Sequence, residues 1–70
     1  MITNKTALEE LIESRNASAI NEMIYIKEIA LNEALSNVDY FKSIGMNEYA
    51  ENEETRVQII KRDLDKLNAA

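Results

Sequence analysis

The stretch Phe41-Lys42-Ser43-Ile44-Gly45-Met46-Asn47-Glu48 contains the only glycine of the chain, and the chain has no proline. Apolar residues spaced three and four apart precede and follow it, and this spacing lines one side of a helix. Glycine adopts the left-handed backbone that ends a helix at little cost, so a glycine between two such patterns is typical of a helix end. The sequence therefore predicts an antiparallel helical hairpin that turns at Gly45.

The two apolar patterns also predict which residues pack between the long helices. We expect one helix over about residues 18–44 and another over about 47–67, the second beginning at Asn47 as its cap. The predicted seam consists of Ile20, Ile24, Lys27, Leu31, Ala34, Val38 and Phe41 before the turn, and of Ala50, Glu53, Val57, Ile60, Leu64 and Leu67 after it. Lys27 is charged, and it either lays its methylene groups along the seam and reaches Asp63 or faces a ligand.

A shorter helix is predicted before the hairpin, over about residues 6–15. Thr6 and Glu9 have the spacing of a capping box, and Arg15 places a positive charge at the helix end. Residues 16–18 are polar, which favours a break with Ser18 as the cap of the next helix, and one continuous helix is the alternative. The sequence thus predicts a single all-α domain over residues 1–70, with a short N-terminal helix followed by a long hairpin.

Length and composition indicate that the chain associates with itself. Seventy residues form one small domain with a marginal core, and a chain without cysteine or histidine has neither a disulfide nor a common structural zinc site. Eight basic and thirteen acidic residues give a net charge of −5, which disfavours binding to nucleic-acid backbones. We expect an acidic homo-oligomer, a dimer or larger.

Residues 23–31 are apolar around nearly the whole circumference of the predicted helix, apart from Lys27 and Glu28. One hairpin partner covers only one side of a helix, so other neighbours must cover the rest. The sequence therefore predicts an interface between copies that assembles an oligomeric helical bundle. The predicted interface residues are Met23, Tyr25, Ile26 and Ile29.

The residue types that most enzymes use are missing. Without histidine or cysteine there is no usual general base, metal ligand or thiolate nucleophile, and a single glycine cannot form a phosphate-binding loop. Carboxylate pairs such as Glu51 with Glu54 fall on predicted exposed faces, where nothing desolvates one of the two groups. We predict no enzymatic activity, no catalytic residue, no cofactor and no metal site.

Three tyrosines lie in the predicted hairpin. We expect Tyr40 and Tyr49 to pack beside Phe41 at the turn and Tyr25 to pack between subunits, because tyrosine joins an apolar ring to a hydrogen-bonding tip. The alternative is a pocket between subunits in which Tyr25 stacks on a small anionic ligand. The residues of this possible ligand site are Tyr25, Lys27 and Arg56.

The basic residues of the last helix alternate with Asp63 and Asp65, so we attribute them to ion pairs within the helix and not to a nucleic-acid site. The N-terminus lacks a signal-peptide pattern, and no apolar run is long enough to span a bilayer. With the absence of cysteine, this predicts a cytoplasmic protein without a membrane partner. The frequent isoleucine, asparagine and lysine indicate an AT-rich bacterial or phage genome.

The leading functional hypothesis is a small non-enzymatic protein-interaction module. Such a regulator, inhibitor or adaptor would act as a helical homo-oligomer that docks on a partner protein. The alternative is an oligomeric small-ligand binder that sequesters an anionic nucleotide-like molecule at subunit interfaces. A third reading, an oligomerisation module without another target, uses the same apolar surface. No sequence motif identifies the partner or the ligand.

Overall fold

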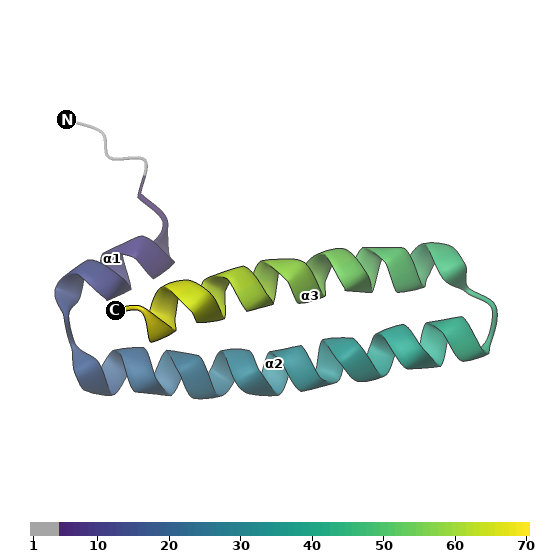
Figure 1. Cartoon of the computed structure of the whole chain (residues 1–70), viewed down its shortest axis with the longest axis horizontal. Coiled ribbons are helices and arrows are strands. Elements are labelled where there is room, and N and C mark those ends of the chain that lie inside the picture. Colours follow the sequence, from purple (N-terminus) through teal and green to yellow (C-terminus); the bar gives the residue numbers. More distant parts are fainter. Residues whose placement is uncertain (1–4) are drawn as a thin grey trace.

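The computed structural model describes residues 5–70, and this part of the chain contains three helices and no strand. The helices are α1 (Ala7–Ser14), α2 (Ala17–Ser43) and α3 (Asn47–Asn68). Helices α2 and α3 lie side by side and antiparallel, and α1 folds back near the start of α2 and the end of α3 (Figure 1). The all-α class and the helical hairpin are therefore confirmed.

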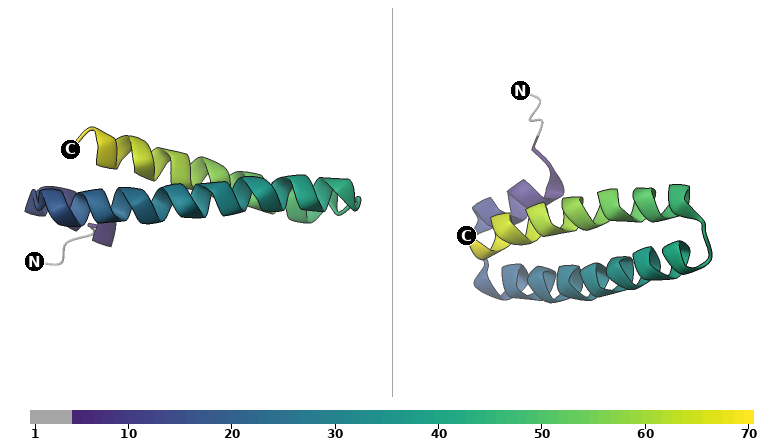
Figure 2. Two further views of the ribbon diagram at one scale, coloured as in Figure 1. Left: turned by 90° about the horizontal axis from the view of Figure 1, so that it is seen from below. Right: turned by 45° about the vertical axis from the view of Figure 1, so that its right-hand side comes forward.

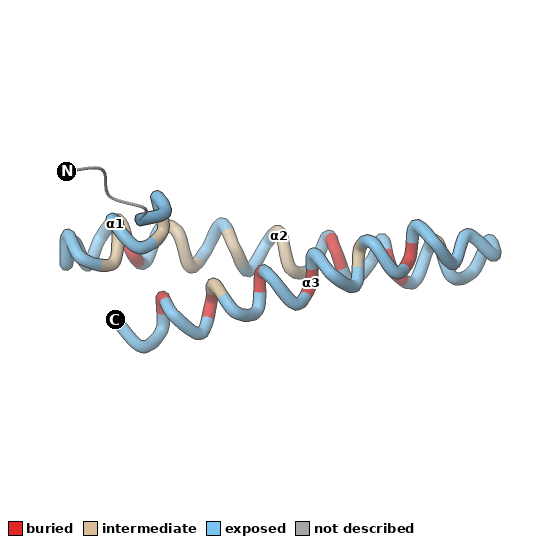
Figure 3. Tube along the Cα trace, turned by 90° about the horizontal axis from the view of Figure 1, so that it is seen from above, coloured by how far each residue is buried: buried red, intermediate tan, exposed pale blue. Residues whose placement is uncertain are grey.

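A narrow layer of apolar side chains holds α2 against α3. Its buried residues lie on the facing sides of the two helices (Figure 3). The buried cluster consists of Ala34, Val38, Val57, Ile60 and Leu64, with Ile24, Ala30 and Leu31 packed on it. All of these except Ala30 belong to the predicted seam. The cluster therefore lies along the predicted seam on both long helices.

The turn between α2 and α3 has the hydrogen bonds of a Schellman motif. Gly45 has a φ of +77°, in the left-handed region. Its N–H donates to the carbonyl oxygen of Lys42 at 3.2 Å, and the N–H of Met46 donates to the carbonyl oxygen of Phe41 at 2.8 Å. These bonds satisfy carbonyl groups that the helix end would leave free. The predicted role of Gly45 is confirmed.

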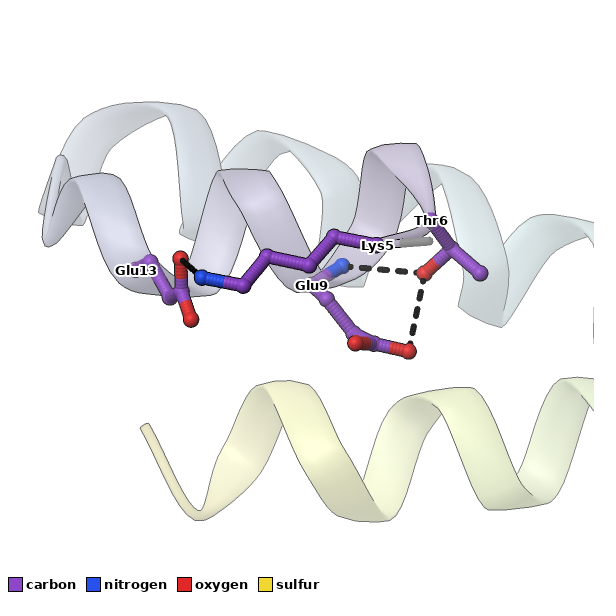
Figure 4. A network of polar contacts seen from close by, with 4 residues as sticks. All are labelled: Lys5, Thr6, Glu9 and Glu13. Atoms are coloured by element: carbon purple, nitrogen blue, oxygen red, sulfur yellow. Dashed lines mark hydrogen bonds and ion pairs between the residues drawn. The ribbon is translucent and has the colours of Figure 1, made fainter. Parts of the chain in front are cut away.

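The start of α1 contains one half of the predicted capping box, and the Glu9 carboxylate accepts from the Thr6 hydroxyl and not from the Thr6 N–H (Figure 4). The N–H of Glu9 donates to the hydroxyl oxygen of Thr6 at 3.2 Å, and that hydroxyl lies 3.3 Å from the Glu9 carboxylate, to which it donates. One turn further on, the ammonium of Lys5 lies 2.6 Å from the Glu13 carboxylate. Because both of these side chains are exposed, this ion pair adds little to the stability of the helix.

The break between α1 and α2 is confirmed, but the predicted cap is wrong. The side chain of Asn16, and not that of Ser18, accepts a hydrogen bond from the N–H of Ala19, at 3.1 Å. Arg15 lies just outside α1 with a φ of +56°, so the chain reverses direction at this residue. This reversal places Asn16 at the N-terminal cap and leaves Ser18 inside the first turn of α2.

The predicted cap of α3 is also wrong. Asn47 is the first helical residue, and Met46 occupies the cap position without a side-chain hydrogen bond. The Met46 backbone is already used at the end of α2, since its N–H bonds to Phe41, while its carbonyl accepts from the N–H of Ala50 at 3.1 Å. Met46 thus takes part in the hydrogen bonds that end α2 and in those that begin α3, so the connection between the two helices is short.

The molecule is flat. Its Cα trace measures 46 × 28 × 14 Å along the principal axes, so it is much thinner in one direction than in the other two. In the view from below, the C-terminal part of α3 diverges to one side of α2, and α1 lies on the other side (Figure 2). The hairpin therefore leaves most of the circumference of α2 uncovered.

Candidate interaction surfaces

An apolar surface on α2 faces away from the hairpin core. Tyr25, Ile26 and Ile29 are 64%, 48% and 44% exposed, and Met23 at their edge is half-buried. Their spacing of three and four residues makes them neighbours on the helix. We call Met23, Tyr25, Ile26 and Ile29 the outer patch; it consists of the residues that the sequence predicts as an interface.

The outer patch has an acidic rim. Glu22, Glu28 and Glu33 lie within one or two helical turns of its residues, and all three are exposed. None of them forms an ion pair within residues 5–70. A molecule that covers the outer patch therefore meets apolar side chains surrounded by negative charge.

The predicted ligand residues do not converge within one copy of the chain. Tyr25 and Lys27 are two positions apart, which places them about 200° apart around the helix axis. The ammonium of Lys27 lies 3.1 Å from the Asp63 carboxylate, and Arg56 lies 3.4 Å from that of Glu53. Tyr25 faces solvent, whereas both cations have acidic neighbours. The predicted reach of Lys27 to Asp63 is confirmed, and the ligand site stays a prediction.

Glu53, the second charged residue of the seam, has polar neighbours as well. The amide of Asn37 on α2 donates to its Oε2 at 3.4 Å, and a guanidinium N–H of Arg56 donates to the same oxygen at 3.4 Å. The side chain of Glu53 is 20% exposed. These contacts explain how a carboxylate is tolerated beside the apolar layer, because a partly buried charge without such neighbours is costly.

A second exposed apolar surface lies at the turn of the hairpin. The ring of Phe41 lies 5.7 Å from that of Tyr40 and 5.6 Å from that of Tyr49, centroid to centroid, so the predicted packing at the turn is confirmed. Yet Tyr40 and Tyr49 remain 60% and 53% exposed. Ile44 and Met46 beside them are also exposed. We call this surface the turn cluster; it consists of Tyr40, Phe41, Ile44, Met46 and Tyr49.

Sequence reasoning did not identify the turn cluster as an interaction surface. The residue types gave a signal, since tyrosine and methionine are enriched at protein interfaces. However, aromatic residues beside a turn are equally expected to pack on one another. Only the tertiary structure shows that ring packing covers about half of each tyrosine.

An open groove of about 660 Å³ lies where α1, the start of α2 and the end of α3 meet. The large apolar side chains that line it are Ile12, Ile20, Ile24 and Leu67. Because α1 forms one wall, the groove depends on how α1 packs on the hairpin, which the sequence does not reveal. Two of its lining residues, Ile20 and Leu67, are buried in the fold itself. Their first role is therefore structural.

The ion pairs of α3 differ from the prediction. Pairing within the helix is found for Arg56 alone, and Asp63 binds Lys27 across the hairpin. Within residues 5–70, Lys61, Arg62 and Lys66 form no ion pair. The second half of α3 therefore presents more free positive charge than its composition indicates.

One further ion pair joins the long helices near the turn. The ammonium of Lys42 lies 2.9 Å from the carboxylate of Glu54. The hydrogen bond and the charge of Glu54 raise the pKa of Lys42 above its ordinary value of 10.5. Both side chains are exposed, so water screens the interaction and the pair positions the helices only weakly.

Among residues 5–70, no group of three or more histidine, cysteine, aspartate or glutamate side chains could hold a metal ion. None of the three helices is long and apolar enough to cross a membrane. Comparisons with protein-family models, curated proteins and solved structures find no match to this chain.

Proposed function

We propose that this chain is a small non-enzymatic protein-interaction module that acts as a helical homo-oligomer and docks on a partner protein. The observation that supports the proposal is the exposure of Tyr25, Ile26 and Ile29 side by side on α2. Removing apolar surface from water contributes about 25 cal/mol per Å². Contiguous exposed apolar side chains rimmed by polar residues are typical of surfaces that contact another protein.

The two exposed surfaces suit two tasks. The outer patch lies in the middle of a long helix, where a second helix can pack along it, and we assign it to self-association. The turn cluster lies at one end of the hairpin and contains two tyrosines, a residue type that is enriched among the dominant contacts of protein interfaces. We assign the turn cluster to the partner protein. A regulator, inhibitor or adaptor of this kind works by covering or bridging surfaces.

Sedimentation velocity tests the self-association. The wild-type chain is expected to sediment as an oligomer, and Ile26→Glu or Ile29→Glu is expected to give a folded monomer, because a charge enters an apolar contact. Leu35→Glu is the matched control, since Leu35 is 43% exposed on another side of α2. A monomeric wild type, or equal dissociation by the control, would contradict the assignment of the outer patch.

Affinity capture from the native host tests the partner. A tagged wild-type chain is expected to retain a defined protein, and the double variant Tyr40→Ser with Tyr49→Ser is expected to lose it. Leu35→Ser serves as the control for loss of an exposed apolar side chain outside both surfaces, since Leu35 is 43% exposed. If the folded wild type and the turn variant recover the same proteins, the turn cluster has no docking role.

A further inference from the structure

The outer face of α2 combines apolar side chains with negative charge in a regular line. Glu22, Ile26, Ile29 and Glu33 follow one another at intervals of four, three and four residues, which places them along a single stripe of the helix. All four are exposed, with the two isoleucines between the two carboxylates. We call these four residues the acidic stripe.

The outer face of α3 has the opposite charge. Ile59 is 50% exposed, with Arg56 three residues before it, Arg62 three after it and Lys66 seven after it. All three cations are exposed, and the side chain of Arg56 is 46% exposed although it contacts Glu53. We call these four residues the basic stripe; it consists of Arg56, Ile59, Arg62 and Lys66.

The ion pair across the hairpin preserves this positive charge. Asp63 lies among the basic residues in the sequence, four positions after Ile59. Its carboxylate is bound to Lys27 at 3.1 Å and is 20% exposed, so it is turned toward the hairpin seam. Arg62 and Lys66 have no ion-pair partner within residues 5–70.

Two acidic stripes would repel each other. In an antiparallel contact centred between Ile26 and Ile29, Glu22 of one copy lies opposite Glu33 of the other. In a parallel contact, each glutamate lies opposite its own counterpart. Both arrangements place like charges together at each end, which opposes association. A symmetric contact of α2 with α2 is therefore disfavoured.

The acidic and basic stripes match in length as well as in charge. Glu22 and Glu33 are 11 residues apart, about 16 Å along a helix, and Arg56 and Lys66 are 10 residues apart, about 15 Å. Cations can therefore reach both glutamates at once. The isoleucines between the glutamates then lie over Ile59 and the methylene stems of the arginines, which also cover apolar surface.

We propose that the occupant of the outer patch is a second copy of this chain, which packs the basic stripe of its α3 against the acidic stripe of α2. This inference rests on the self-association in the proposed function. It adds that the basic stripe of a second copy is the surface that packs on the outer patch. Because the two stripes lie on different helices, the contact forms either twice about a two-fold axis or repeatedly from copy to copy.

Charge reversal on each stripe tests the contact by sedimentation, with far-UV circular dichroism to verify the helices. The variant Glu22→Lys with Glu33→Lys and the variant Arg62→Glu with Lys66→Glu are each expected to weaken self-association about tenfold or more in Kd. An equimolar mixture of the two variants is expected to restore association, since reversed stripes complement each other. Lys61→Glu, on the opposite side of α3 from Ile59, is the matched control and is expected to associate like the wild type.

The outcomes separate this inference from the function on which it rests. If the glutamate variant dissociates while the arginine–lysine variant associates normally, copies associate through α2 but not through the basic stripe, and the inference is overturned alone. If the wild type is monomeric at a concentration of about 100 µM, well above the Kd of a functional interface, the proposed self-association is wrong as well. Docking of a partner at the turn cluster is judged separately by affinity capture.

Discussion

The Nζ atom of Lys27 on α2 lies 3.1 Å from the Oδ2 atom of Asp63 on α3, and the two side chains are only 28% and 20% exposed. The pair joins the long helices beside their apolar layer. It directs the charge of Lys27 away from the outer patch and withdraws Asp63 from the basic stripe. One ion pair therefore shapes both the core of the hairpin and the charge of its outer surfaces.

Removing one member of this pair should cost more than replacing both members with apolar residues. Asp63→Asn leaves a half-buried ammonium without its partner, and we expect it to lower the free energy of unfolding by about 1 kcal/mol. The double variant Lys27→Met with Asp63→Leu removes both charges and keeps apolar side chains beside the seam, and we expect a change within about 1 kcal/mol or a gain. Urea denaturation measures both. A larger loss for the double variant than for Asp63→Asn would show that the ion pair is net stabilising.

Leu67 should contribute strongly to stability although it lies near the end of the chain. It is 1% exposed, so Leu67→Ala is expected to lower the free energy of unfolding by about 2–4 kcal/mol through lost burial and a cavity. Leu35→Ala, at a position 43% exposed, is the control and should cost less than about 1 kcal/mol. Thermal and urea denaturation compare the two. Similar losses would indicate that the end of α3 frays.

Substitution of Gly45 isolates the cost of its backbone conformation. A Cβ added there meets nothing within 4 Å, while φ is +77°. Gly45→Ala is therefore expected to lower stability by about 1 kcal/mol through strain alone, and Gly45→Asn by less. A synthetic chain with D-alanine at this position should be at least as stable as the wild type, because D-residues favour positive φ. Loss of stability with D-alanine would point to a steric clash.

The cap of α2 offers a test of the revised helix boundary. Asn16→Ala removes the acceptor for the N–H of Ala19 and should lower the free energy of unfolding by about 1 kcal/mol. Asn16→Asp should retain most of the stability. Ser18→Ala, now inside the first turn, should have little effect. Urea denaturation measures the stability of the three variants. A larger loss for Ser18→Ala than for Asn16→Ala would place the cap at Ser18 instead.

The hairpin and its central ion pair could be predicted because both follow from one register. Gly45 sets where the chain turns, and antiparallel pairing then places Lys27 within reach of Asp63. The helix caps could not be predicted to the residue. Asn16 and Ser18 are both good caps, and the choice between them depends on the left-handed backbone of Arg15. Because such a backbone is usually signalled by glycine, an arginine in this conformation could not be predicted from the sequence.

An exposed apolar surface could be predicted only where the apolar residues of a helix occupy more of its circumference than one neighbouring helix can cover. This applies to Ile26 and Ile29, whose exposure matches the surplus apolar residues of α2. It fails for Tyr40 and Tyr49, because residues that pack on Phe41 can be covered or exposed depending on how the rings tilt. The sequence also does not reveal that Arg62 lacks an ion-pair partner within residues 5–70. Asp63 and Asp65 are close enough in the sequence to pair with it, and only the structure shows that Asp63 binds Lys27 instead.

The single apolar layer between α2 and α3 has a consequence for amide hydrogen exchange. Along most of its length each long helix packs on only one other helix, so few of its amides are shielded by more than their own hydrogen bond. An isolated copy should therefore exchange its helical amides within a narrow range of rates, without a slow inner set. Stacking of copies would add a second layer, and the slow set should then appear first on the covered face of α2.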